Sequence, residues 1–304
     1  MNKAIVFGAN GFLGANLTRF LSKRGVTVYA FVPKGFDYTI ISGLPNVNCI
    51  EFMFDKLSEL DGLFKDVDLI YNFVWVGVGA DSRNNEKIQS VNLSYNIDVL
   101  QYAQRNGIKR ILIPGSASEY ACCDDVIDGY NMPAPSDIYS ATKIANYYLC
   151  NSICAKYGIE LIYPIITSIY GPGRDDNNLL SYVIKELLQG KKPSTTKLEQ
   201  KWDYLYIDDL INALFLLGQK GKGGVIYPVG YGHAKQISEY VNVIRDLIDP
   251  SLEIGIGDKP YKSIKIDNQI MDISKLVKDT GFKPEYSFEQ GIKKVIDYFK
   301  SIVR

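Results

Sequence analysis

Short apolar runs alternate with longer amphipathic stretches along the first half of the chain. The runs are rich in β-branched and aromatic residues, have the length of strands, and cover residues 4–7, 26–32, 47–52, 68–73 and 110–114. Between them, one pattern of helical spacing ends at Gly25, and another covers residues 87–106. Strands that alternate with helices in this way are typical of a parallel sheet that is covered on both faces.

The pattern becomes less regular after residue 166. It predicts a helix over residues 139–157 and a strand over 160–166, and the turn residues Tyr170-Gly171-Pro172-Gly173 then mark a boundary between lobes. Polar loops and short strands separate four further predicted helices, at residues 178–188, 207–219, 237–247 and 288–302. We expect residues 1–166 to form the sheet domain and residues 167–304 to form mainly a smaller lobe, with some segments returning to the sheet.

Charge and composition exclude several classes of function. Lys plus Arg and Asp plus Glu both total 34, so neither nucleic acid nor an anionic membrane is an expected partner. No apolar run approaches the about 18 residues that span a membrane, and Met1 leads directly into the first strand without room for a signal peptide, so we expect a cytoplasmic protein.

The cysteine pattern indicates unmodified thiols and favours neither a metal site nor a disulfide framework. There are five of them, at positions 49, 122, 123, 150 and 154, and their number is odd. Cys150 and Cys154 share a helix face, but a zinc site needs four ligands and the only histidine is His233. We therefore expect buried thiols and no metal.

A glycine-rich loop lies between the first strand and the first helix. Glycines at this place permit a tight turn and a close approach of the backbone to a pyrophosphate, and the helix N-terminus offers free N–H groups. The strand before the loop and the amphipathic helix after it favour a dinucleotide site over a structural turn. The residues that we expect to contact the dinucleotide here are Gly8, Asn10, Gly11, Phe12, Leu13 and Gly14. A Rossmann-type, doubly wound parallel sheet with a smaller, mixed α/β substrate-binding lobe is the predicted fold.

The end of the second strand favours NADP over NAD. An acidic residue that binds the adenosine ribose is expected there, but Val32 holds the place and Lys34 follows, where it can attract a 2′-phosphate. The alternative for Lys34 is a solvated loop charge. Asp55, after the third strand, is a candidate for the adenine amino group, and the alternative for it is an ordinary surface aspartate.

Tyr139 and Lys143 are the candidate catalytic pair. They are four residues apart and therefore share one face of the predicted helix, where the lysine charge lowers the pKa of the phenol toward a value useful for proton transfer. Ser116 follows the fifth strand, at the carboxyl end of the sheet where open α/β folds bind ligands, and its hydroxyl can hold a substrate oxygen.

With these residues in place, the chain resembles the extended short-chain dehydrogenase/reductase family, which includes nucleotide-sugar epimerases, dehydratases and reductases. The resemblance covers nearly the whole chain. It rests on the glycine loop, the Tyr-x-x-x-Lys pair, Ser116, Asn92 in the long helix, Tyr170-Gly171-Pro172, residues 202–209, residues 272–275 and residues 281–284.

The resemblance implies a role for each matched residue. Tyr139 is the expected general acid/base, Lys143 the residue that binds the nicotinamide ribose, Ser116 the residue that binds the reacting oxygen, and Asn92 a further residue of the cofactor site. It also implies a nucleotide-sugar substrate and a homodimer formed through the helix that bears Tyr139 and the long helix before the fifth strand.

The residues around Ser116 narrow the reaction. Family dehydratases carry an Asp-Glu pair where this chain has Ala117 and Ser118, and reductases that also epimerise carry a Cys where Ser118 stands. Glu119 is acidic but takes the place of an apolar family residue. What remains is reduction of a 4-keto-6-deoxy nucleotide sugar, which the NADP assignment favours, or 4-epimerisation through a transient ketone. Two competing functions are a dinucleotide-binding scaffold or sensor without catalysis, and an oxidoreductase that acts on a non-nucleotide carbonyl.

The expected substrate contacts depart from the family pattern. Ser168 stands where many relatives carry an Asn that contacts the nucleotide diphosphate, and Trp202 replaces an arginine that often binds it. Arg174 or Lys201 is a candidate to compensate. Trp202 either stacks on a base or sugar or packs between the lobes. Ser118 completes the set of candidate substrate residues.

Overall fold

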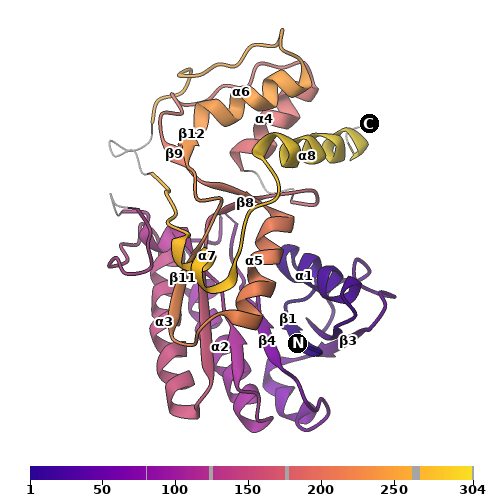
Figure 1. The fold of residues 1–304 in the computed structure, drawn as a ribbon. Helices are drawn as coiled ribbons and strands as arrows, with labels where there is room; N and C mark the ends of the chain where they lie inside the picture. Colours follow the sequence, from indigo (N-terminus) through magenta and orange to yellow (C-terminus); the bar gives the residue numbers. More distant parts are fainter. Residues whose placement is uncertain (80, 123–125, 175–177, 262–267, 303–304) are drawn as a thin grey trace.

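A parallel sheet forms the core of the lower half of the molecule (Figure 1). The computed structural model describes residues 1–79, 81–122, 126–174, 178–261 and 268–302. The strand order is β11-β7-β5-β4-β1-β2-β3, and the short strand β6 pairs alongside β7. Every pairing in this sheet is parallel. The strands are β1 Lys3–Phe7, β2 Thr27–Pro33, β3 Val47–Phe52, β4 Leu69–Asn72, β5 Arg110–Leu112, β6 Gly115–Ser116, β7 Glu160–Ile166 and β11 Val225–Val229. This is the Rossmann-type doubly wound order, so the predicted fold is confirmed.

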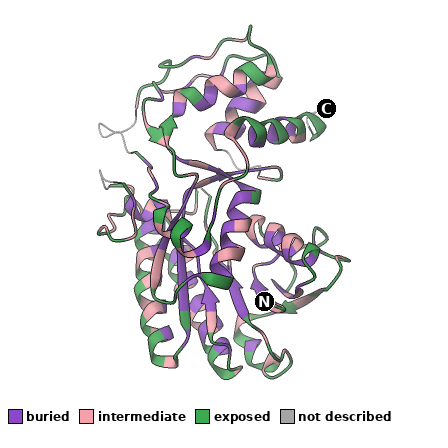
Figure 2. Cartoon of the chain, in the orientation of Figure 1, coloured by how far each residue is buried: buried purple, intermediate pink, exposed green. Residues whose placement is uncertain are grey.

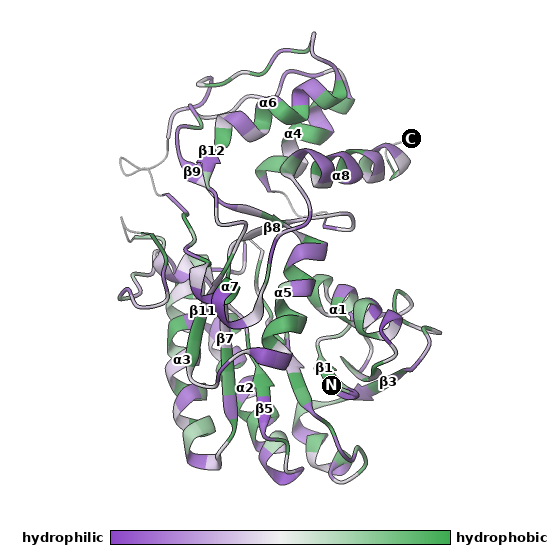
Figure 3. Ribbon diagram, viewed as in Figure 1, coloured by the Kyte–Doolittle hydropathy of each residue, from purple (hydrophilic) through white to green (hydrophobic). Residues whose placement is uncertain are grey.

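Two hydrophobic cores lie on the two faces of the sheet. Along β1, Ala4 and Val6 belong to one core and Ile5 and Phe7 to the other, because side chains alternate between the faces of a strand. Figure 2 shows the buried strands between helices with exposed outer faces, and Figure 3 shows that the same strands are hydrophobic. The continuous apolar character of the runs read from the sequence therefore follows from burial on both sides.

Helices cover each face of the sheet (Figure 1). The pair α2 Glu86–Arg105 and α3 Ile138–Tyr157 pack together, and on the other side α1 Phe12–Lys23 packs against α5 Ile207–Lys220. The strand order reverses between β1 and β4. The carboxyl ends of these strands form the crevice in which open α/β sheets bind ligands.

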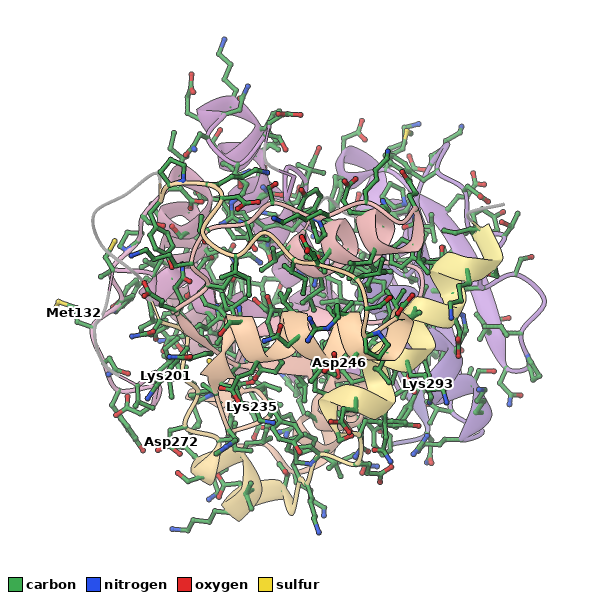
Figure 4. All side chains as sticks on the ribbon, turned by 90° about the horizontal axis from the view of Figure 1, so that it is seen from above. Met132, Lys201, Lys235, Asp246, Asp272 and Lys293 are labelled. Carbon is green, nitrogen blue, oxygen red and sulfur yellow. The ribbon has the colours of Figure 1, made fainter. Side chains whose placement is uncertain are left out.

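The remaining elements build the upper part of the molecule, which Figure 4 views from above. They are α4 Leu179–Leu188, α6 Ile237–Ile248, α8 Phe288–Ile302 and two small sheets, β8 Ser168–Tyr170 with β10 Tyr204–Tyr206 and β9 Lys201–Trp202 with β12 Lys235–Gln236. By contrast, β11, α5 and the short helix α7 Ser274–Thr280 lie against the main sheet or its helices, although they follow residue 166. The domain boundary at residue 166 stays a prediction.

None of the described helices combines the length and the apolar character that a membrane span requires. Cys150 and Cys154 are buried thiols, as predicted, whereas Cys49 is half-buried and Cys122 is exposed. Cys123 lies outside the described residues.

Candidate active site

The glycine loop joins β1 to α1 at the sheet crevice, and two of its glycines, Gly8 and Gly14, are sterically required. Gly8 has φ +71°, and a Cβ on it would lie 3.1 Å from the carbonyl carbon of Phe73. A Cβ on Gly14 would lie 2.1 Å from the carbonyl oxygen of Gly8. Glycines at both positions therefore let the helix, the loop and the end of β4 approach closely.

The start of α1 suits an anionic group. Its N-cap, Gly11, makes no side-chain hydrogen bond to the first turn, and that turn contains no acidic residue. Unpaired N–H groups and the positive end of the helix dipole both favour a phosphate at this place. Asn10, Phe12 and Leu13 are half-buried around the same turn. The loop therefore fits the dinucleotide that the sequence predicts.

At the end of β2, Val32 is fully buried and the Lys34 side chain is exposed. The nearest following carboxylate, Asp37, accepts hydrogen bonds from the backbone N–H and the hydroxyl of Thr39. Asp55 is exposed in the first turn of the 3₁₀ helix η1 Phe54–Leu60. Lys34 and Asp55 therefore stay predictions as cofactor contacts.

The helix α3 presents Tyr139 and Lys143 together. Asp137 caps it by accepting from the backbone N–H of Ser140 at 2.7 Å, which fixes Tyr139 in the first turn. Tyr139 is 8% exposed and Lys143 only 6%, and the Lys143 Nζ lies 5.9 Å from the centre of the Tyr139 ring. The lysine ammonium donates to the carbonyl oxygen of Pro114 at 3.0 Å, so it is held at the end of β5.

Ser116 lies next to Tyr139 and Lys143, at the end of a sheet strand. It ends β6 and caps the 3₁₀ helix η2 Ala117–Tyr120, and its Oγ lies 2.9 Å from the Oγ of Ser118. Burial raises the pKa of Tyr139 above its ordinary value, while a side-chain hydrogen bond with Ser116 lowers it. The structure thus brings together the three residues predicted as catalytic, and Ser118 beside them.

Glu119 points into the protein interior. It is 2% exposed, and its Oε1 accepts from the backbone N–H of Ser116 at 2.6 Å and from the Tyr163 hydroxyl at 3.2 Å. Burial raises the pKa of this carboxyl, and the nearby Lys143 lowers it. In the lysine, burial lowers the pKa and Glu119 raises it. A buried acid therefore lies directly behind the candidate catalytic residues.

Two residues at the site belong to no sequence motif. Trp75 lies with its ring centre 3.7 Å from the Lys143 Nζ and edge-on to Tyr139 at 5.9 Å. Arg83 places its guanidinium 4.1 Å from the centre of the Tyr139 ring. Both come from the segment that connects β4 to α2, and nothing in the local sequence predicts that this segment meets α3.

Asn92 is buried in α2 and supports that segment from behind. Its side chain accepts from the backbone N–H of Val76 at 2.8 Å and donates to the Val76 carbonyl at 3.0 Å. Both ends of the amide are therefore used to hold the backbone next to Trp75. A direct contact of Asn92 with the cofactor stays a prediction, and the role that the described contacts give it is positioning.

Besides Ser118, the candidate substrate residues are Ser168 on β8, Trp202 on β9 and Arg174, which follows β8. Trp202 donates from its indole N–H to the Ser168 hydroxyl at 2.8 Å, so the two departures from the family pattern bind each other. The Arg174 guanidinium lies 6.0 Å from the ring centre of Phe12, beside the glycine loop. Lys201 lies on β9, near Lys235 of β12 on the upper surface (Figure 4). Arg174 is therefore better placed than Lys201 to reach a ligand in the crevice.

An open pocket of about 290 Å³ lies in the upper part of the molecule, and no sequence motif indicates it. Its lining comes from α4, the segment before β9 and the start of α6, and includes Leu179, Tyr182, Thr195, Gln200 and Ile237. The described residues hold no group of three or more His, Cys, Asp or Glu side chains that could bind a metal ion.

Comparison with known proteins gives one family match and several relatives. The sequence profile of the NAD dependent epimerase/dehydratase family matches residues 4–230. A dTDP-glucose 4,6-dehydratase of Shigella flexneri is 31% identical over 176 residues, which cover 55% of this chain and 48% of that protein. The match thus spans about half the length of the dehydratase. An uncharacterized protein of Methanocaldococcus jannaschii is 23% identical and matches 97% of this chain and 95% of its own.

Two solved structures show the same fold. UDP-glucose 4-epimerase of Thermotoga maritima superposes with a TM-score of 0.87 at 18% identity and covers 99% of this chain and 100% of its own. UDP-glucuronic acid 4-epimerase of Bacillus cereus, in complex with NAD, gives a TM-score of 0.85 at 20% identity, with 99% of this chain and 100% of that chain covered.

Proposed function

The chain belongs to the NAD dependent epimerase/dehydratase family, and from this premise we propose that it is an oxidoreductase acting at C4 of a nucleotide-activated sugar. The favoured reaction is reduction of a 4-keto-6-deoxy nucleotide sugar. The observation that carries the proposal is the meeting of Ser116, Tyr139 and Lys143 at the carboxyl end of the sheet, beside a glycine loop shaped for a dinucleotide. A dinucleotide-binding scaffold without catalytic activity would not require all three of these residues.

The three residues supply the proton side of the reaction. A dinucleotide held at the glycine loop would supply, when bound, the hydride that reduces C4 of the sugar. Tyr139 gives its phenolic proton to the C4 oxygen as negative charge develops there, and Ser116 holds that oxygen by a hydrogen bond. Lys143 keeps a positive charge next to the tyrosinate that results, and solvent returns the proton to Tyr139 afterwards.

Sugar dehydration is disfavoured by the surroundings of Ser116. Expulsion of water needs an acid and a base beside the neighbouring carbons, but Ala117 is apolar and Ser118 is neutral. Glu119, the nearest carboxyl, is bound to the backbone of Ser116 and to Tyr163 in the interior. A buried carboxyl with these partners has no path to the substrate side of the loop.

The cofactor that we propose is NADP. The carboxylate that selects the ribose 2′-hydroxyl is absent at the end of β2, and Asp37 is engaged by Thr39 within its own loop. Lys34 is exposed at this point, and no acid at the end of β2 would repel the 2′-phosphate. The Bacillus cereus relative was solved with NAD, so this preference concerns the present chain and not the family.

The lobe formed mainly by residues 167–304 is the proposed substrate-binding part. The pocket beside α4 offers apolar walls from Leu179 and Ile237 and polar groups from Thr195 and Gln200, a mixture suited to a nucleotide base and ribose. Arg174, between this lobe and the glycine loop, is the proposed contact for the diphosphate.

Cofactor turnover separates reduction from 4-epimerisation, the second candidate, which uses the same Tyr139 and Ser116. The test is to denature the purified protein, identify any released dinucleotide, and assay NADPH oxidation with 4-keto-6-deoxy nucleotide sugars. We expect stoichiometric NADPH oxidation and little retained cofactor. Near-stoichiometric retained NAD, with UDP-hexose interconversion and no external cofactor turnover, would replace the reductase by the epimerase.

Glu119→Gln is expected to move the pH profile of turnover to lower pH. The negative charge of Glu119 raises the pKa of both Tyr139 and Lys143, so its removal lowers both. Tyr139 must be protonated to reduce a ketone, and the alkaline limb of kcat therefore moves downward. The measurement is kcat from pH 6 to 11.5 for both proteins. An unchanged alkaline limb would show that Glu119 does not act on the catalytic pair.

A further inference from the structure

Arg83 connects the loop before α2 to the start of the catalytic helix. Its Nε donates to Asp137 Oδ2 at 2.9 Å, and Asp137 is the residue that caps α3. Next to it, the side chain of Asn84 accepts from the backbone N–H of Ile138 at 3.2 Å. The Arg83 and Asp137 side chains are only 31% and 17% exposed, so this ion pair is partly shielded from water.

The same guanidinium lies over the face of Tyr139, at 4.1 Å from the ring centre. Trp75 meets the ring edge-on, and Lys143 lies on the face of Trp75. The two aromatic rings, Tyr139 and Trp75, therefore lie between two cations, Arg83 and Lys143. An aromatic face attracts a guanidinium, so this contact favours one orientation of the phenol ring.

The charged groups around the Tyr139 phenol come from three places in the fold. Arg83 faces it from the loop before α2, Lys143 and Asp137 from α3 and its cap, and Glu119 from η2. Ser116 of β6 adds a hydroxyl. Arg83 acts against the two carboxylates, because it lowers the pKa of Tyr139 and they raise it.

We propose that Arg83 is a positioning residue for the proposed reaction: stacked on Tyr139 and paired with Asp137, it orients the phenol toward Ser116 and places a permanent positive charge beside it. This inference rests on the proposed function, because it concerns the same proton transfer. The Tyr-x-x-x-Lys pattern supplies one cation to the tyrosine, and this chain supplies two.

The second cation matters because the first is deeply buried. Burial lowers the pKa of Lys143 below that of an ordinary lysine, whereas arginine side chains keep their charge at every pH at which enzymes work. Arg83 lowers the pKa of Tyr139. It therefore makes the phenol a stronger acid over the whole working range and still stabilises the tyrosinate when Lys143 is neutral.

The test compares Arg83→Gln and Arg83→Lys with the unmodified protein in the 4-keto sugar reduction assay. For Arg83→Gln we expect kcat at pH 7 to fall about tenfold, the scale of a lost positioned charge, and the alkaline limb of kcat to move to higher pH. Arg83→Lys keeps the charge and is expected to restore most of the profile but only part of kcat, because it loses the contact of the guanidinium with the ring face.

The direction of the shift separates charge from structure. Glu119→Gln is expected to move the alkaline limb of kcat to lower pH. A substitution that only loosens the start of α3 is expected to leave the position of this limb unchanged. A profile of Arg83→Gln equal to that of the unmodified protein, or a lower kcat without any shift, would overturn the inference. An active Tyr139→Phe protein would instead overturn the proposed function, so the two failures are distinguishable. Dinucleotide affinity, measured in parallel, confirms that each variant is folded.

Discussion

Replacement of Tyr139 by Phe is expected to lower kcat by at least about 1,000-fold, while the affinity for the dinucleotide stays within about threefold of the original. The substitution removes only the phenolic oxygen, which is the proton donor in the proposed reaction. The ring remains, and with it the stacking of Arg83 and the edge contact with Trp75. The cofactor loop, at the end of β1, is untouched.

A second tyrosine on the same helix provides the matched control. Tyr148 is 58% exposed on α3, so Tyr148→Phe removes the same atom from the same element without touching the site. Its kcat is expected to equal that of the unmodified protein. The measurements are steady-state kinetics with the 4-keto sugar and a fluorescence titration with NADPH. Undiminished turnover in Tyr139→Phe would end the catalytic assignment.

The sheet and the three catalytic candidates are predictable because each depends on local patterns. A strand buried on both faces is a continuous apolar run, and the β3 and β7 bounds predicted from such runs agree with the structure. Tyr139 and Lys143 share a helix face by their spacing alone. Ser116 is placed by a rule of the fold, since the ends of parallel strands meet at one edge of the sheet.

Trp75 and Arg83 are not predictable because their roles depend on a contact between distant segments. The loop before α2 reaches the start of α3 across more than fifty residues of sequence, as the Arg83–Asp137 and Asn84–Ile138 bonds show. The short helix α7 is not predictable from the sequence for a related reason. Its seven residues hold too few turns for an amphipathic pattern, and its position is fixed by contacts with α5 and β11.

Motifs nominate polar residues for the candidate site, but they do not reveal the partners of those residues. The family pattern predicts Asn92 at the cofactor, yet both ends of its amide bind the backbone of Val76. Taken singly, Ser168 and Trp202 each indicate a lost phosphate contact. Their mutual hydrogen bond shows that the two replacements form a pair, which no inspection of either position alone reveals.

Gly14→Ala is expected to lower dinucleotide affinity at least about 100-fold and to destabilise the protein without ligand by about 1–3 kcal/mol. The added Cβ would lie 2.1 Å from the Gly8 carbonyl oxygen and 2.8 Å from the Ala9 Cα. Both are backbone atoms that cannot rotate away. The start of α1 must therefore move from the end of β1, which withdraws the N–H groups that the phosphates need.

Gly11→Ala is the matched control for this effect. Gly11 has φ −74°, which alanine adopts without strain, and a Cβ there would come no closer than 3.4 Å to the Gly8 oxygen. Its melting temperature without ligand is expected to equal that of the unmodified protein, while that of Gly14→Ala falls by several degrees. Thermal melts with and without NADPH measure both effects. An unchanged melt and full affinity in Gly14→Ala would mean that the loop tolerates a side chain, and a pyrophosphate cradle built on close backbone approach would then be the wrong description of residues 8–14.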